Sequence, residues 1–330
     1  MNGIILRVEQ SRVEQSRAGD VDLLRGICIV LMVMGHVSFG VEFDKWIHGF
    51  HMPVWFIISG FFANTKRDYI VYIKRKSRVI MVPYLFFSLL YEVIWSILGN
   101  NQWIGLIWPN TIEIPLNGAL WFLPALFFVD IVGIFCLKFF SKYLAYITLF
   151  VLALVGSIHF IPLPLSLDSA LVGCGFFLVG YILREHGKKL LNIKWIPSIC
   201  LMILATIMIM LNGYVNVRTN EYAVIPLFWI NAILATIALW NICGSIERLD
   251  THIKPIKNSL IFLKKVGSDS LVYVCANQFF IWILSFLPIS MGNTITMLIW
   301  HMIEVCIVVM TCYLLNRIIR KTPLKIMLGK

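Results

Sequence analysis

Charged residues are scarce in this sequence. They make up 14% of the 330 residues, whereas 59% are hydrophobic and the mean hydropathy is +0.84. A soluble domain of this length exposes far more charge than this. The composition therefore excludes a soluble globular protein and indicates an integral membrane protein.

Paired cysteines are also absent. The eight cysteines are scattered through apolar runs, and no two of them form a Cys-x-x-Cys pair. This spacing argues against a disulfide framework and against a zinc site, so we expect no metal. We interpret the cysteines as small residues that pack inside an apolar interior.

Long apolar segments are what the sequence has in abundance. Compared with a hydrocarbon thickness of about 30 Å, they predict an all-α membrane protein with about ten transmembrane helices. The predicted helices are 23–41, 48–64, 79–98, 119–137, 143–161, 168–183, 195–212, 223–243, 268–287 and 294–315.

Basic residues are distributed unevenly between the loops that join these segments. Of the 28 Lys and Arg residues, 25 fall on one side of the membrane, Lys45 and Arg218 fall on the other, and Arg25 lies within the first helix. The positive-inside rule therefore places both termini in the cytoplasm. This topology, together with contacts to anionic membrane lipids, accounts for the net charge of +11. We therefore expect no nucleic-acid partner.

The chain reads as one membrane domain, 21–316, between a polar leader and a basic tail. The leader, 1–20, contains a tandem Arg-Val-Glu-Gln-Ser repeat and has too few apolar residues to form a core. The tail, 317–330, is expected in the cytoplasm with the leader. Nothing at the N-terminus resembles a cleaved signal peptide.

The first predicted helix carries a cation and a titratable side chain on one face. His36 follows Arg25 by eleven residues, which is about three helical turns and roughly 16 Å along the axis. Ionisable groups inside a membrane helix are candidates for a functional site. The plain alternative for His36 is a hydrogen bond to a neighbouring helix.

Further candidates lie toward the outer side. His51 precedes Pro53 at the expected start of the second helix, so it and His36 can face one cavity. Trp121 lies at the outer mouth of the fourth helix, after the nearly uncharged loop 99–118. Aromatic and amide side chains there suit a sugar or a lipid-linked sugar, and they equally suit an interfacial aromatic belt.

The densest cationic run precedes the third predicted helix, between residues 66 and 78. One interpretation is topology and binding of anionic headgroups. The other is a clamp for a polyphosphorylated ligand, in which Arg75 and Arg78 make bidentate phosphate contacts.

Several polar residues lie within other predicted helices and need partners. Glu92 and Asp130 either pair structurally or bind substrate, and the structural interpretation is slightly favoured. Asn277 and Gln278 are adjacent amides that either line the same cavity as His36 and His51 or form hydrogen bonds between helices.

Four blocks, in this order, resemble the membrane acyltransferase-3 family. They are Asp22-x-Leu-Arg25-Gly26 leading to Gly35-His36, Phe50-His51-Met52-Pro53 with Ser59-Gly60-Phe61, the entry from Arg75 and Arg78 to Pro83-Tyr84, and Leu120-Trp121-Phe122-Leu123. The similarity extends over nearly the whole chain. One departure is that Asn277-Gln278 stands where a Tyr-Leu-x-His-like block is common.

The resemblance implies an O-acyltransferase of the bacterial cytoplasmic membrane. It would take an acyl group, usually acetyl from acetyl-CoA, and transfer it to a hydroxyl of a cell-envelope sugar such as O-antigen, exopolysaccharide or a lipid-linked saccharide. Carried over, the functional residues are Arg25, His36 and His51. Arg25, Arg75 and Arg78 would hold the CoA phosphates, and a homo-oligomer is compatible with the sequence.

Two other classes fit part of the pattern. A transporter or flippase for an envelope glycolipid would also have buried charges and a polar cavity. The sequence shows no paired broken helices in matching halves, which many secondary transporters have. A purely structural assembly partner is disfavoured by the intramembrane Arg25 and His36.

Overall fold

Helices make up nearly all of the fold in the computed structural model, which describes residues 2–158, 162–187, 189–249, 253–287 and 294–329. In chain order they are α1 (Asn2–Val37), α2 (Val41–His48), α3 (His51–Phe61), α4 (Tyr69–Lys76), α5 (Val82–Ile97), α6 (Phe122–Phe139), α7 (Lys142–Ile158), α8 (Leu167–Glu185), α9 (Trp195–Asn212), α10 (Ile225–Glu247), α11 (Lys254–Ser268), α12 (Ser270–Leu284) and α13 (Thr294–Lys321). A π-helical turn, Ser77–Met81, joins α4 to α5, so that the two run on as one helical segment.

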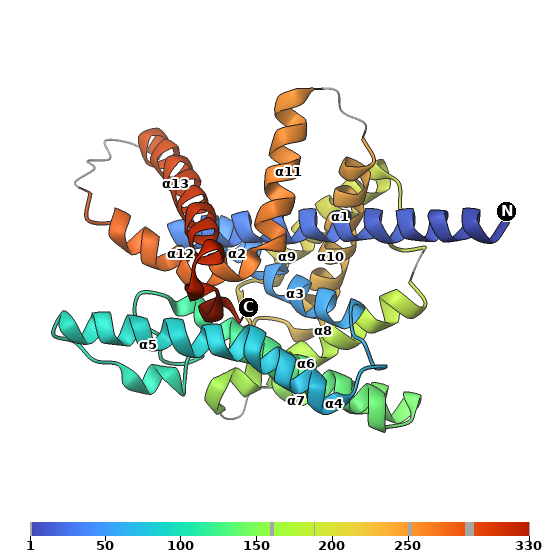
Figure 1. Cartoon of the computed structure of the whole chain (residues 1–330), viewed down its shortest axis with the longest axis horizontal. Helices are drawn as coiled ribbons and strands as arrows, with labels where there is room; N and C mark the ends of the chain where they lie inside the picture. The colour runs from blue at the N-terminus through green and yellow to red at the C-terminus, as the bar shows by residue number, and fades with distance from the viewer. Residues whose placement is uncertain (1, 159–161, 188, 250–252, 288–293, 330) are drawn as a thin grey trace.

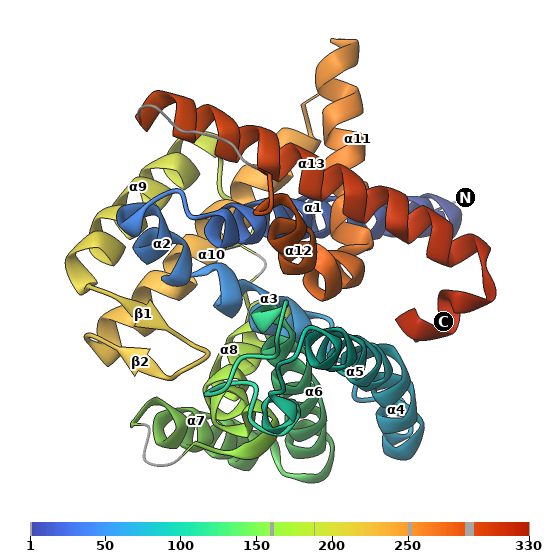
Figure 2. The same cartoon turned by 90° about the vertical axis from the view of Figure 1, so that its left-hand side faces the viewer.

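The short α3 lies between two groups of helices. Figure 2 shows α4 to α8 on one side of it, and α1, α2 and α9 to α13 on the other. In Figure 1 the paired α4 and α5 run along the lower edge of the molecule, while α1 crosses its upper part. Both groups therefore meet around the segment that begins with His51.

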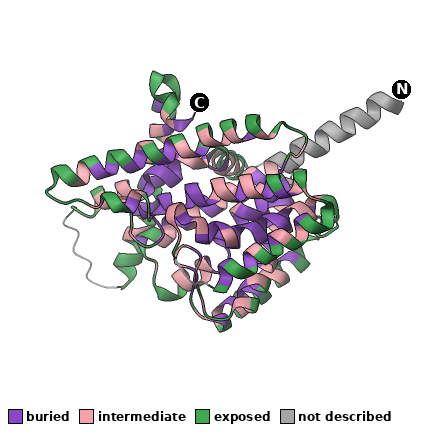
Figure 3. Cartoon of the chain, turned by 90° about the horizontal axis from the view of Figure 1, so that it is seen from below, coloured by how far each residue is buried: buried purple, intermediate pink, exposed green. Residues whose placement is uncertain are grey.

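Six helical segments are long and apolar enough to cross a membrane, within the part of the chain that the structure describes. They are Tyr69–Ile97, Gly118–Phe139, Pro164–Glu185, Trp195–Asn212, Ile225–Glu247 and Thr294–Lys321, and α7 and α12 are shorter apolar helices. In α6 and α8, 67% of the apolar window is buried, against 22% in α9 and 28% in α13. The latter two helices therefore turn most of their apolar surface outward. Figure 3 shows that exposed residues gather on the periphery of the bundle and buried residues in its interior.

The structure differs from the predicted helices in several places. The first helix ends at Val37, because Ser38 and Gly40 adopt positive φ angles of 75° and 104°. Residues 41–48 then form α2, although 42–47 were expected as a connecting loop, and α3 has 11 residues, about 16 Å, which is too short to cross a bilayer alone. The count of ten spans therefore stays a prediction.

Both α4 and α11 occupy stretches predicted as loops. The four lysines of α11 suggested a cytoplasmic connection, yet Val266 and Gly267 are buried in the bundle. The last three residues of the predicted helix 143–161 and the last residue of the tail, 330, lie outside the described residues. Within the leader, α1 continues back to Asn2.

Glycines allow α3 and α8 to cross with their backbones in contact. A Cβ on Gly180 would lie 1.9 Å from the Ile57 carbonyl oxygen, and one on Gly60 would lie 1.8 Å from the Phe177 carbonyl oxygen. Small residues at such crossings are typical of packed membrane helices. The contact fixes α3, and with it His51, against α8 and the group of helices α4 to α8.

Gly180→Ala is therefore expected to lower the thermal stability of the detergent-solubilised protein. The added methyl group has to separate two backbones, and overpacking of this kind costs about 1–3 kcal/mol. Gly35→Ala is the matched control, since its Cβ would meet nothing closer than 3.7 Å and alanine favours a helix. Equal melting temperatures for the two variants, measured by tryptophan fluorescence, would contradict this account of the crossing.

Candidate functional site

A polar cavity of about 280 Å³ lies beside the end of α1 and the beginning of α3. Its wall is built from α1, α2, α3, α12, the loop before α6 and the β-hairpin after α9. We call it the histidine cavity, because His36, His48 and His51 all line it. Trp55 and Trp121 add aromatic surface to the same wall.

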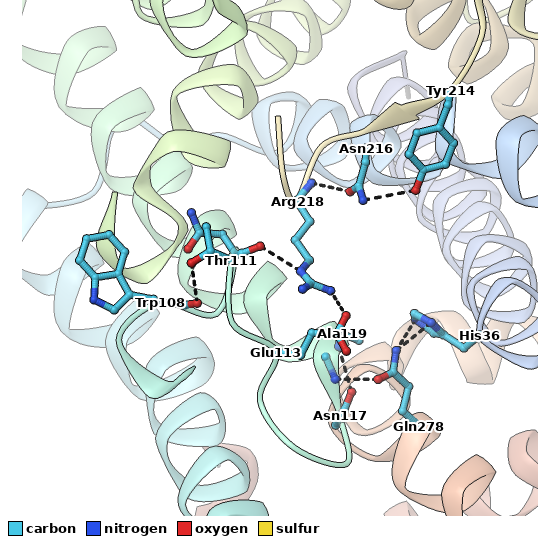
Figure 4. A network of polar contacts seen from close by, with 12 residues as sticks. His36, Trp108, Thr111, Glu113, Asn117, Ala119, Tyr214, Asn216, Arg218 and Gln278 are labelled. Carbon is cyan, nitrogen blue, oxygen red and sulfur yellow. Dashed lines mark hydrogen bonds and ion pairs between the residues drawn. The ribbon is translucent and has the colours of Figure 1, made fainter. Parts of the chain in front are cut away.

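His36 is held by a side chain from the far end of the sequence. The Gln278 amide nitrogen, on α12, lies 2.7 Å from His36 Nδ1 and 3.2 Å from His36 Nε2. The Gln278 carbonyl oxygen accepts a hydrogen bond of 2.6 Å from the Gly118 backbone N–H. Figure 4 shows Gln278 between His36 and this loop. Both ends of the Gln278 amide are therefore fixed by its neighbours.

The other two histidines lie on the two short helices. His48, on α2, places Nδ1 2.8 Å from the Asp44 carbonyl oxygen and 3.1 Å from the Asp44 carboxylate. His51, at the start of α3, places Nδ1 2.7 Å from the Ile47 carbonyl oxygen. The two rings meet edge to face, with centroids 5.2 Å apart. Since carbonyl and carboxylate oxygens only accept, Nδ1 carries the proton in both neutral rings.

An ion pair between Arg218 and Glu113 forms another part of the cavity wall. Arg218 donates to the Glu113 carboxylate, and its Nε donates to the Asn110 carbonyl oxygen at 3.1 Å. The Arg218 backbone N–H donates to the Asn216 side chain at 3.0 Å. These contacts join the loop before α6 to the hairpin in which β1 (Val215–Asn216) pairs with β2 (Glu221–Tyr222).

Tyr214, just before the hairpin, also lines the cavity. Partial burial, with a contribution from the Asp44 carboxylate, raises the pKa of its phenol, so the side chain is neutral over the physiological range. Its oxygen accepts from the Asn216 amide at 3.4 Å. The cavity therefore offers donors and acceptors of several kinds around the three imidazoles.

A second, more open groove of about 660 Å³ continues from this cavity. Four residues line both the cavity and the groove, namely His36, Glu113, Gly118 and Gln278. Trp282 lines the groove but not the cavity. The two spaces therefore meet at His36. A ligand longer than one sugar ring can lie in the groove while one end reaches the histidines.

Arg25 lies at the other end of the α1 apolar segment and does not line the histidine cavity. Its guanidinium is 3.8 Å from the Asp22 carboxylate and 5.8 Å from the centre of the Phe62 ring. Its Nε is buried, with no hydrogen-bond partner among the described residues. A buried donor of this kind needs water or a ligand.

The two arginines predicted to join Arg25 lie on the α4–α5 segment. Arg75 is exposed on α4, and Arg78 is exposed in the π-helical turn that follows. Neither lines the histidine cavity or the adjoining groove. Their part in phosphate binding stays a prediction.

Three other predicted site residues face protein partners. Asp130 is fully buried and bonds with Ser59 and Lys76. Glu92 accepts from the Gln102 backbone N–H at 3.2 Å, and Asn277 donates within its own helix to the Tyr273 carbonyl oxygen at 2.7 Å. None of the three lines the histidine cavity, whereas the predicted Trp121 and Gln278 do.

Sequence reasoning missed Asp44 and His48. Their spacing of four residues was visible in the sequence and is the spacing that brings side chains together on a helix. The expected loop 42–47 separates Asp44 from a helix expected to begin at His48, and the spacing has no meaning across a loop. Glu113 and Arg218 are far apart in sequence, and no pattern linked them.

Comparison with protein families gives a match over most of the chain. A family model described as an acyltransferase domain matches residues 19–324, which is nearly the whole chain. A search among proteins of curated function finds no match. The matched region contains α1 from residue 19 onward and every residue of the histidine cavity described above.

Proposed function

Because the chain belongs to the acyltransferase-3 family, we propose that it is a membrane O-acyltransferase that acylates a cell-envelope sugar. The donor in this proposal is cytoplasmic acyl-CoA, most simply acetyl-CoA, and no metal takes part. The acceptor is a hydroxyl of O-antigen, exopolysaccharide or a lipid-linked saccharide. The membrane is the bacterial cytoplasmic membrane, with both termini inside, as the distribution of Lys and Arg supports.

The observation that carries this proposal is the setting of His36. It opens on a polar cavity with two tryptophans in its wall, Trp55 and Trp121, and an adjoining groove. Tryptophan faces with nearby amide and carboxylate groups suit a sugar, whose rings have apolar faces and polar edges. Imidazoles at the same place supply the proton transfers that an acyl transfer to a hydroxyl requires.

The donor would enter from the other end of α1. Arg25 is roughly 16 Å from His36 along the helix, a distance that the extended pantetheine arm of CoA can bridge. Its guanidinium, with Arg75 and Arg78, would hold the CoA phosphates on the cytoplasmic side. The thioester would then reach the histidine cavity from within the bundle, and the acceptor would enter from the groove.

Membranes from cells that express the chain are expected to transfer label from [14C]acetyl-CoA to their saccharide fraction. The label should be released by mild alkali, because O-esters are cleaved by base and amides are not. Membranes without the protein are the control. Absence of alkali-labile label, together with a glycolipid trapped on the cytoplasmic face of cells lacking the gene, would contradict the proposal and favour a transporter.

A further inference from the structure

The three imidazoles of the histidine cavity differ in which nitrogen is free. A general base needs a lone pair that faces its substrate and an environment that accepts the positive charge it acquires. The hydrogen bonds of the cavity decide both points. They lead to a residue that neither the sequence nor the family pattern had indicated.

His36 has its lone pair occupied. Because the Gln278 carbonyl accepts from Gly118 N–H, its amide nitrogen is the end that faces His36, and it lies nearest to Nδ1. That nitrogen donates, so Nδ1 accepts and the neutral ring carries its proton on Nε2. A protonated His36 would turn an N–H toward the Gln278 N–H groups. His36 is therefore set up to donate a hydrogen bond rather than to take a proton.

His51 has a free Nε2 lone pair but no anion to support a charge. Its Nδ1–H donates to the Ile47 carbonyl oxygen, and only 7% of the residue surface is exposed. Placing a positive charge on a buried ring beside a neutral carbonyl is costly. His51 instead packs its ring against His48, with an interplanar angle of 84°.

His48 meets both requirements. Its Nδ1–H donates to the Asp44 backbone carbonyl at 2.8 Å, and the Asp44 carboxylate lies 3.1 Å from the same nitrogen, which leaves the Nε2 lone pair free. The side chain is 25% exposed and lines the cavity. An adjacent carboxylate orients an imidazole and stabilises its protonated form, as in other carboxylate–histidine bases.

We propose that the Asp44–His48 pair is the general base of the acyl transfer and that His36 is the hydrogen-bond donor to the reacting carbonyl. This rests on the proposed function. His48 Nε2 takes the proton of the acceptor hydroxyl as the hydroxyl oxygen attacks the thioester carbonyl carbon. The carbonyl oxygen gains negative charge and accepts the hydrogen bond from His36 Nε2–H. The intermediate then collapses, the C–S bond breaks, and the CoA thiolate takes the proton from His48.

Gln278 is a positioning residue in this scheme. It fixes which nitrogen of His36 carries the proton, and Gly118 fixes Gln278. Several other groups face the Asp44–His48 pair and contribute to the local field, namely His36 from α1, His51 from α3, Tyr214 and Arg218 from the hairpin region, and Glu113 across the cavity.

The test measures the pH dependence of alkali-labile [14C]acetyl transfer in membranes of cells expressing the full chain. His48→Gln is expected to lower the rate by about 10²–10⁴-fold, the usual contribution of a general base. Asp44→Asn leaves the backbone carbonyl that accepts from Nδ1–H but removes the carboxylate charge beside it, so the acid limb of the pH–rate profile should move to lower pH. His186→Gln, on the exposed end of α8, is the control.

A near-normal rate for folded His48→Gln would overturn the inference, as would an acid limb that Asp44→Asn leaves unmoved. If His48→Gln does not fold, the isosteric Asp44→Asn still decides. Failure of the inference is distinguishable from failure of the proposed function. In the first case the wild-type membranes still transfer label, and in the second they do not.

Discussion

Replacing His36 with alanine is expected to reduce acyl transfer by about 10²–10³-fold, the usual loss when one oxyanion donor is removed. His36 lies where the histidine cavity and the adjoining groove meet, so its N–H faces the place where donor and acceptor would come together. The initial rate of alkali-labile [14C]acetyl incorporation into membrane saccharide measures the effect. His36→Gln should retain more activity than His36→Ala, because the glutamine amide still donates a hydrogen bond.

The control for this prediction is His301→Ala. His301 lies on α13, where it pairs with Glu304 at 3.3 Å, and it does not line the histidine cavity. Its replacement should leave the rate near that of the wild type. A folded His36→Ala protein with full activity would show that His36 takes no part in the reaction.

Replacing Arg25 with alanine is expected to raise the apparent KM for acetyl-CoA and to lower kcat/KM by roughly 10–100-fold. Hydrogen bonds to a charged phosphate contribute about 1.5–3 kcal/mol each, and the buried Arg25 Nε has no partner among the described residues. Arg25→Lys should recover only part of the loss, because an ammonium group lacks the paired N–H geometry. The measurement is the rate as a function of acetyl-CoA concentration.

Arg317→Ala provides the comparison for Arg25. Arg317 is exposed near the end of α13 and stacks on Tyr313, with 5.9 Å to the ring centre. If both arginines affected KM equally, the effect would reflect general surface charge. An unchanged KM for acetyl-CoA in Arg25→Ala would show that Arg25 does not bind the donor.

The sequence was sufficient to predict the fold class and part of the cavity. Long apolar runs predicted the helical membrane architecture, because a helix satisfies its backbone hydrogen bonds within one continuous apolar segment of the chain. Arg25 and His36 lie on one continuous helix, as their spacing predicts, although that helix begins at Asn2, well before Arg25. His51 was expected to face one cavity with His36, and it lines that cavity. Trp121 and Gln278 line it as well, whereas Asn277, for which the same two alternatives were open as for Gln278, does not.

The parts that sequence reasoning missed depend on long-range contacts. Lys76 satisfies Asp130, and Arg218 satisfies Glu113, through pairs that no local pattern reveals. The helix α2 was missed because Ser38 and Gly40, whose positive φ angles end α1, were expected within the first helix, and residues 42–47 were expected as a short outer connection. That error concealed the Asp44–His48 pair, since only a helix brings residues four apart together.

The most direct test of the central claim is the O-acetyl content of envelope saccharide in a strain lacking the gene. We expect one O-acetyl signal in the proton NMR spectrum to disappear in this strain, to return with the wild-type chain and to stay absent with folded His36→Ala. Such a result would tie O-acetylation to the histidine cavity. An O-acetyl pattern that is the same in all four strains, including the parent, would contradict the account.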